Sequence, residues 1–139
     1  MNLITDRTAR DVALGTEKGH YNRTDLNRVE MAVQALLQLA KGLDLQGSWD
    51  VKTDWDLPES FGSDTWVTVE QMVRYLDNVH RLCQALRLTA ELPGTMNGLS
   101  YEGANQIEQA LCLAEERILD ILNTFRFSGE LFAGEENRL

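Results

Sequence analysis

Residues 100–125 read SYEGANQIEQALCLAEERILDILNTF, and this stretch decides the fold. Its apolar side chains recur in alternating steps of three and four residues, the spacing of one buried face on an α-helix. Ser100 can accept a hydrogen bond from a first-turn amide, so a helix is expected over 100–126, with Ser128 and Gly129 marking its end. The residues of the buried face are Ala104, Ile107, Leu111, Ala114, Ile118, Ile121 and Phe125.

Two other stretches carry the same apolar spacing and predict two more long helices, at residues 24–43 and 68–90. Each begins with polar residues that can satisfy the free amides of a first helical turn. The expected caps are Asn22 or Thr24 for the first of these helices, and Thr68 with Gln71 for the second.

A narrower apolar face over residues 5–14 predicts a short N-terminal helix, capped by Thr5 or Asp6. A chain of 139 residues suits a single domain with one core. The sequence therefore predicts an all-α fold in one domain spanning 1–139. The expected architecture is an antiparallel three-helix bundle preceded by the short helix.

The connection at 47–67 alternates apolar and polar side chains, the period-two pattern of a half-buried strand that Pro58 would end. A single strand is not stable alone, so the C-terminal tail, with Phe125, Phe127 and Leu131, is the predicted partner. We therefore expect a small irregular or β element at one end of the bundle. The alternating residues are Trp49, Val51, Thr53, Trp55 and Leu57.

The chain is acidic, with a net charge of −9 and no basic stripe, which argues against nucleic-acid binding. The N-terminus lacks the apolar core of a signal peptide, and no apolar run approaches the ~18 residues of a membrane span. We expect no membrane association and folding in a cytoplasm. The two cysteines, Cys83 and Cys112, are expected to be buried free thiols.

The sequence contains no pattern typical of a catalytic, metal or cofactor site. His80 and Cys83 share a helix face, but a structural zinc site needs about four ligands. Ser100 misses a nucleophile elbow because Glu102 stands where glycine is required. The carboxylates of the last helix, including Glu108, are interpreted as a solvated face. We therefore predict a protein that is not an enzyme, with no metal and no cofactor.

Large aromatic residues in the connection and the acidic tail are candidates for partner contacts, because such rings dominate interface energies; covering the end of the bundle is the alternative. Polar residues beside buried positions are expected to bond loop backbone or fix helix register. In particular, Asn105 is expected to bond the connection at 92–99. The aromatic candidates are Trp49, Trp55, Trp66 and Phe132, and the polar ones are Asn27, Arg28, Arg74, Asn78 and Asn105.

Five motifs occur in order along nearly the whole chain: T-D-R-T at 5–8, Y-N-x-T-D-L-N-R-V at 21–29, M-x-R-Y-L-x-N-V at 72–79, L-P-x-x-M-x-x-L-S-Y-x-x-A-N-x-I-E at 92–108 and S-G-E-L-x-A-G-E at 128–135. Together they resemble a module of tail-region and minor structural proteins from phages and prophages of Gram-positive bacteria. The resemblance implies a virion-associated or assembly protein, with no catalytic or cofactor residues to carry over.

The expected function is that of a non-enzymatic phage tail or baseplate-region structural protein, acting through contacts with other phage tail proteins. It would reside in the cytoplasm of the bacterial host during assembly, and the virion is a second expected location. One alternative is a chaperone-like tail-assembly accessory that is absent from the virion. Another is a carbohydrate-binding accessory that uses exposed tryptophans. Self-association into a homo-oligomer is left open.

Overall fold

The computed structural model describes residues 1–43, 45, 47–55 and 68–136, with side chains as far as Thr124. Within these ranges the regular structure is entirely helical and contains no strand, so the predicted all-α class is confirmed for the described part. The elements in chain order are α1 (Ala9–Leu14), the 3-10 turn η1 (Glu17–Gly19), α2 (Arg23–Leu39), the 3-10 turn η2 (Lys41–Leu43), α3 (Val69–Ala85) and α4 (Tyr101–Glu136).

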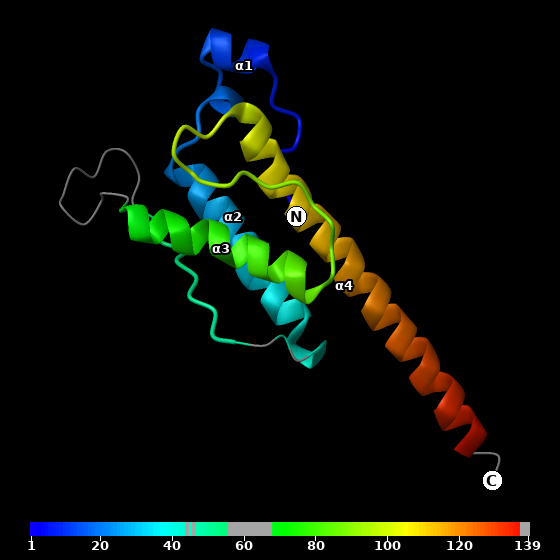
Figure 1. The fold of residues 1–139 in the computed structure, drawn as a ribbon. Helices are drawn as coiled ribbons and strands as arrows, with labels where there is room; N and C mark the ends of the chain where they lie inside the picture. Colours follow the sequence, from blue (N-terminus) through cyan, green and yellow to red (C-terminus); the bar gives the residue numbers. More distant parts are fainter. Residues whose placement is uncertain (44, 46, 56–67, 137–139) are drawn as a thin grey trace.

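The three long helices pack against one another, and each contacts the other two (Figure 1). With 36 residues, α4 is about 54 Å long, whereas α2 and α3, with 17 residues each, are about 26 Å long. The long helix therefore runs past the ends of both neighbours (Figure 1). The short α1 packs on η1, beside the N-terminal part of α4.

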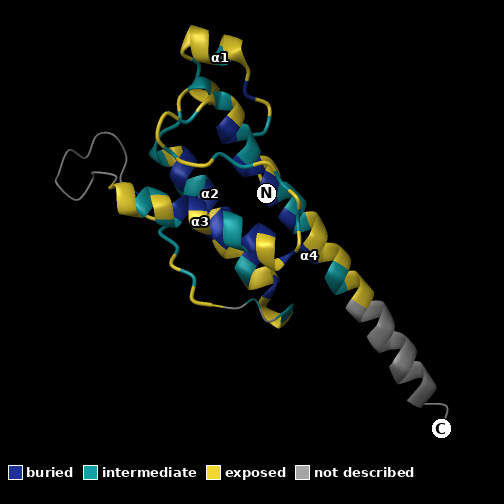
Figure 2. Cartoon of the chain, viewed as in Figure 1, coloured by how far each residue is buried: buried dark blue, intermediate teal, exposed yellow. Residues whose placement is uncertain are grey.

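The buried apolar residues form one cluster where α2, α3 and α4 meet (Figure 2). The predicted buried face of α4 is confirmed from Ala104 to Ile118, and Ile121 is partly buried against the same cluster. The side chain of Phe125, the last residue of that predicted face, lies outside the described residues. Fully buried members from the three helices include Val29, Val79, Leu82, Ile107, Leu111, Ala114 and Ile118.

The predicted caps of the long helices are present. On α2, Asn22 accepts from the Thr24 amide at 2.9 Å and forms a capping box with Asp25. On α3, Thr68 and Gln71 form the predicted capping box. At the start of α4, the hydroxyl of Ser100 accepts from the Gly103 amide at 3.0 Å. The polar residues at these three starts therefore satisfy first-turn amides as the sequence indicates.

The prediction of a helix over 5–14 capped by Thr5 or Asp6 is wrong at its start. Helix α1 begins at Ala9, and its cap is Thr8, which forms a capping box with Asp11. The preceding residues are extended because their backbone bonds the side chains of α4, as described below. Backbone groups that were expected to lie in the first turn of the helix at 5–14 are therefore bonded to a side chain of α4.

Helix α3 ends at Ala85, five residues before the predicted end at residue 90. Arg87 has a left-handed backbone with φ of 55°. The amide of Leu88 donates to the Cys83 carbonyl at 2.8 Å, and the amide of Arg87 donates to the Gln84 carbonyl at 3.1 Å. This pair of bonds is the Schellman motif, which ends helices and usually has glycine in the left-handed position.

Replacing Arg87 by glycine is expected to raise the free energy of unfolding by up to about 1.6 kcal/mol. A left-handed non-glycine residue costs about 1–2 kcal/mol, and the added freedom of glycine in the unfolded chain offsets about 0.4–1 kcal/mol of that gain. Urea unfolding measures the change. Arg87→Ala is the control, because it removes the same charge and keeps the strain; a glycine variant less stable than the alanine variant would contradict this explanation.

The predicted β element is wrong in the part that the structure describes. Residues 48–55 include no strand, and their expected partner, the C-terminal tail, is helical because α4 continues to Glu136 rather than ending near residue 126. Gly129, expected to end this helix, lies within it. One glycine costs a helix only about 1 kcal/mol relative to alanine, which the flanking helical turns can absorb. Residues 56–67 of the connection lie outside the described residues.

Candidate functional site

Four charged side chains meet where the N-terminal segment, α2 and α4 come together: Arg7, Asp25, Arg28 and Glu108, here called the Glu108 cluster. Glu108 is completely buried, and its two oxygens accept from Arg7 Nη2 at 2.5 Å and Arg28 Nε at 2.7 Å. Asp25 Oδ1 also bonds both arginines, at 3.2 Å from Arg7 and 2.5 Å from Arg28. Two cations and two anions thus neutralise one another; three are buried, and the side chain of Arg28 is 20% exposed. The interpretation of Glu108 as part of a solvated face is wrong.

The same cluster fastens the extended N-terminal segment to α4. The amide of Ile4 donates to Glu108 Oε1 at 3.0 Å. Asn105 bonds both backbone groups of Arg7, accepting from its amide at 3.0 Å and donating to its carbonyl at 2.9 Å. Asn105 was expected to bond the connection at 92–99, and its bonds to Arg7 correct that expectation. The N-terminal segment is therefore an integral part of this cluster.

Two tyrosines lie beside the Glu108 cluster, and their hydroxyl groups are hydrogen-bonded to each other: Tyr21, which precedes α2, and Tyr75 on α3. Burial is the largest influence on both, and it raises the pKa of each phenol above the ordinary value. Hydrogen bonding to Glu108 is likewise the largest reason that the pKa of Arg28 is raised. The tyrosines therefore stay neutral, and Arg28 stays charged, well into alkaline solution.

The free energy of unfolding is expected to fall as the pH rises above about 10, the ordinary tyrosine pKa. Above that pH the unfolded chain loses phenolic protons that the folded chain keeps, so the stability is complete below it and declines towards the raised folded pKa values. Urea unfolding across this pH range should show a smaller decline for a Tyr21→Phe, Tyr75→Phe double variant than for the parent. Tyr101→Phe removes an unburied tyrosine whose pKa is also raised, through its hydrogen bond to Glu102, so it should lessen the decline less than the double variant does. An equal decline in the double variant would contradict this explanation.

A second buried acid, Glu30 on α2, organises the Glu30 cluster, defined as Glu30, Arg74 and Trp55. Glu30 is 2% exposed. Arg74 from α3 donates to both of its oxygens, at 2.6 and 3.1 Å, and the indole N–H of Trp55 donates to one of them. The amide of Lys52 adds a further bond to Glu30 at 3.1 Å. One carboxylate thus joins two helices and the segment that follows α2.

Side chains of α2 and α3 bond the backbone of that segment over residues 48–55. The amide and carbonyl of Trp55 both bond the side chain of Asn27, at 2.7 and 3.0 Å. The carbonyl of Asp50 accepts from Asn78 at 2.8 Å and from Arg74 at 2.7 Å. Backbone groups in an extended segment must be bonded somewhere, and here side chains supply the partners that a neighbouring strand would supply. These side-chain bonds explain why a segment with alternating apolar and polar residues is not a strand.

The tryptophans expected to contact a partner have different surroundings. Trp55 is 5% exposed, and its ring belongs to the core. Trp49 is half-buried, and the guanidinium of Arg81 lies over its ring at 4.2 Å. Trp66 and the side chain of Phe132 lie outside the described residues. Neither described tryptophan therefore presents a free ring to solvent.

The burial of Glu30 and Glu108 was not predicted, although the positions of both acids in the sequence indicate it. Glu108 follows Ala104 by four residues and precedes Leu111 by three, which places it on the apolar face of its helix. Glu30 stands in the same relation to Leu26 and Val33. An acid on a buried face indicates a buried partner, because an unpaired buried charge is strongly unfavourable.

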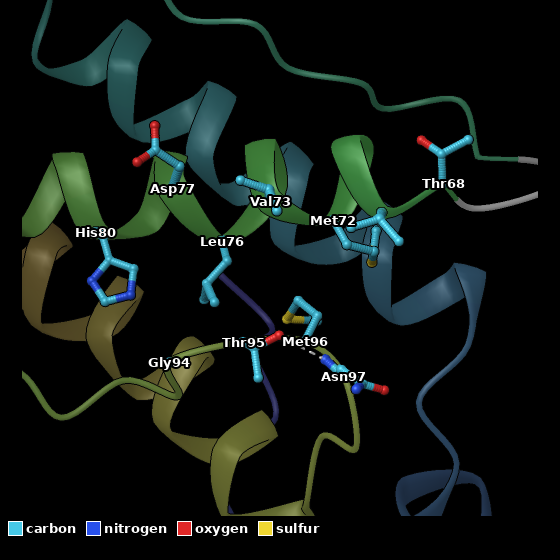
Figure 3. Close-up of a pocket in the computed structure, with 11 residues that line it drawn as sticks. Thr68, Met72, Val73, Leu76, Asp77, His80, Gly94, Thr95, Met96 and Asn97 are labelled. Atoms are coloured by element: carbon cyan, nitrogen blue, oxygen red, sulfur yellow. Dashed lines mark hydrogen bonds between the residues drawn. The ribbon is translucent and has the colours of Figure 1, made fainter.

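A groove lies between α3 and the loop at 93–97 (Figure 3). It encloses about 680 Å³ and opens to the surface. Leu76 points from α3 towards the loop, whereas the carboxylate of Asp77, which is also a lining residue, points away from the loop (Figure 3). The outer edge of the groove carries Val69 and Val73, which are 80% and 63% exposed. We call this feature the α3 groove.

The buried acids Asp25, Glu30 and Glu108 are each bonded to an arginine. Within the described ranges, no group of three or more His, Cys, Asp or Glu side chains could bind a metal ion. Cys83 is buried, which raises the pKa of its thiol and lowers its reactivity. Among the helices that the structure describes, none combines the length and the apolar character needed to cross a membrane.

Comparison with known proteins finds no matching family model, no matching curated protein and no matching solved structure.

Proposed function

We propose that this chain is a non-enzymatic structural protein of a phage or prophage tail or baseplate region, acting through contacts with other tail proteins. The proposal rests on the resemblance carried by the five motifs, and one observation supports it. Ten polar residues of those motifs fall in or beside the two buried clusters, while others, such as Thr8, Asn22 and Ser100, cap helices. The ten are Arg7, Tyr21, Asp25, Asn27, Arg28, Arg74, Tyr75, Asn78, Asn105 and Glu108.

This observation matters because similarity between amphipathic helices can arise from apolar spacing alone. The motifs also share polar residues, and in this chain those residues fix the N-terminal segment and residues 48–55 on the helices. These bonds give the polar residues of the motifs a positioning role that apolar spacing alone would not require. The helical-bundle architecture belongs to the same proposal, since it is what such a set of bonds would preserve.

A role through contacts, rather than catalysis, fits the chemistry of the two clusters. Asp25, Glu30 and Glu108 each bond at least one arginine, so their oxygens are engaged in bonds that hold the fold together. Stacking on sugars needs exposed rings, and neither of the two tryptophans that the structure describes offers one. Trp55 is buried, and Arg81 covers the ring of Trp49.

Deleting the gene from an inducible prophage that carries it tests this proposal. Induced cultures of the deletion strain should yield particles without functional tails, counted by electron microscopy and by infectivity. A plasmid copy of the wild-type gene should restore both counts. Normal numbers of tailed, infective particles from the deletion strain would overturn the proposal.

A further inference from the structure

We propose that the α3 groove binds an amphipathic helix of a protein partner, with a lysine or arginine of that helix placed against Asp77. The inference deepens the proposed function and rests on it for the existence of a protein partner. The groove is the described surface at which apolar side chains, a recess and an unpaired charge occur together.

Two exposed valines form the outer edge of the groove. Val69 and Val73 are separated by four residues, so they lie one turn apart on the same side of α3. At 80% and 63% exposure they form an apolar edge that no described residue covers. Isolated surface valines are ordinary, but these two border an apolar recess, so a partner could cover ridge and recess together.

Apolar side chains from α3 and the loop at 93–97 form the floor of the groove. Leu76 is buried there, while Met72 and Met96 line both the groove and an adjoining cavity of about 340 Å³. The two methionines therefore separate the two spaces. Methionine side chains are flexible and adapt to different occupants, so rotation of either one would deepen the groove towards the adjoining cavity. The floor can thus accept a bulky apolar side chain.

The lining of the groove carries a negative charge. Asp77 is exposed, and among the described residues it has no hydrogen bond and no ion pair. The described lining contains no lysine or arginine. The whole chain carries a net charge of −9. A helix with a basic residue beside its apolar face is therefore the occupant that this groove attracts.

The shape favours a helix over a small molecule. The apolar surface continues out of the recess along the ridge of Val69 and Val73, and a small ligand enclosed in the recess would leave that ridge in water. A helix laid along the groove places side chains at positions i, i+3 or i+4, and i+7 against ridge and floor together. Such docking buries the whole apolar surface.

The test uses the purified full chain and a displayed library of Ala-rich helical peptides of roughly 18 residues, long enough to be helical in water. Two positions spaced i, i+4 vary among Leu, Met and Phe, and one neighbouring position varies among Lys, Arg, Ala and Glu. The targets are the wild type, Val73→Asp, Asp77→Lys and the control Val12→Asp. Val12 is also an exposed valine, at 48%, and lies on α1 away from the groove.

The wild type and Val12→Asp should both enrich peptides with Lys or Arg at the charged position. Asp77→Lys should enrich Glu instead and weaken binding of the Lys peptides about two- to fivefold, the range of an exposed ion pair. Val73→Asp should weaken binding at least about tenfold, since it places a charge on the apolar ridge. Circular dichroism should show that all variants remain folded.

Equal enrichment on Val73→Asp, or the same charge preference on Asp77→Lys, would overturn the inference. Light scattering that shows a wild-type dimer dissociated by Val73→Asp would also overturn it, because the groove would then be occupied by a second copy. This test needs no phage, so its failure is distinct from failure of the proposed function. Peptide binding without any tail defect in the deletion strain would leave the groove assignment intact and remove the phage role.

Discussion

Replacing Glu108 by alanine is expected to lower the free energy of unfolding by about 3–5 kcal/mol, the usual loss when one partner of a buried ion pair is removed. The variant would leave Arg7, whose side chain is 2% exposed, and Arg28 with Asp25 as their one remaining acid. It would also leave the amide of Ile4 without its acceptor. Destabilisation should therefore include release of the N-terminal segment.

Urea unfolding followed by circular dichroism measures the loss, and amide hydrogen exchange at Ile4 and Arg7 reports release of the segment. The matched control is Glu116→Ala, an exposed acid on the same helix, which should change the free energy of unfolding by less than about 0.5 kcal/mol. If Glu108→Ala unfolded at the same urea midpoint as this control, the Glu108 cluster would not be a determinant of stability.

Replacing Glu30 by alanine is the prediction with the second largest effect, a loss of about 2–3 kcal/mol. Removing it would leave three donors without their acceptor: the guanidinium of Arg74, the indole of Trp55 and the amide of Lys52. Loss of a hydrogen bond to a charged group costs about 1.5–3 kcal/mol. The loss should be smaller than for Glu108, because the Arg74 side chain is 18% exposed and water can solvate it.

Tryptophan fluorescence provides a specific readout for Glu30→Ala, because Trp55 should move from the core to water. The emission should shift to longer wavelength in native buffer, before global unfolding. Glu70→Ala, an exposed acid on α3, should leave the emission unchanged. An unshifted emission in Glu30→Ala would mean that residues 48–55 stay in place without this acid.

The sequence was sufficient to predict the helices whose packing is local and periodic. The buried face of α4 from Ala104 to Ile118 was predicted residue by residue, since every third or fourth position is apolar. The caps at Ser100 and Thr68 were also predictable, because capping depends on residues three positions apart. Contacts within one helix or one turn join residues that are close in the sequence, so the local pattern of residues predicts them.

The features that the sequence did not reveal depend on contacts between distant residues. Arg7 and Glu108 are separated by 101 positions, and their bond determines where α1 begins. The alternation at 48–55 predicted a strand, but the backbone of this segment is bonded by Glu30 and Asn27 of α2 where a neighbouring strand was expected. Periodicity identifies which face is buried, and it does not identify what lies opposite.

The candidate contact residues show the same limit. Aromatic rings in a long connection suggested a binding surface, yet Trp55 became part of the core through its bond to Glu30. The sequence did not predict a binding role for Val69 and Val73, because two valines at the start of a helix are ordinary. Their exposure beside a recess became evident once α3 and the loop at 93–97 were placed side by side.

The most direct test of the central claim, that this chain belongs to a phage tail, is quantitative peptide mass spectrometry on purified particles from an induced host carrying the gene. The account predicts peptides of this chain at a fixed small ratio to the major tail protein. That ratio should stay constant through successive purification steps. Absence from the particles while the chain is abundant in the lysate would contradict a structural role in the tail.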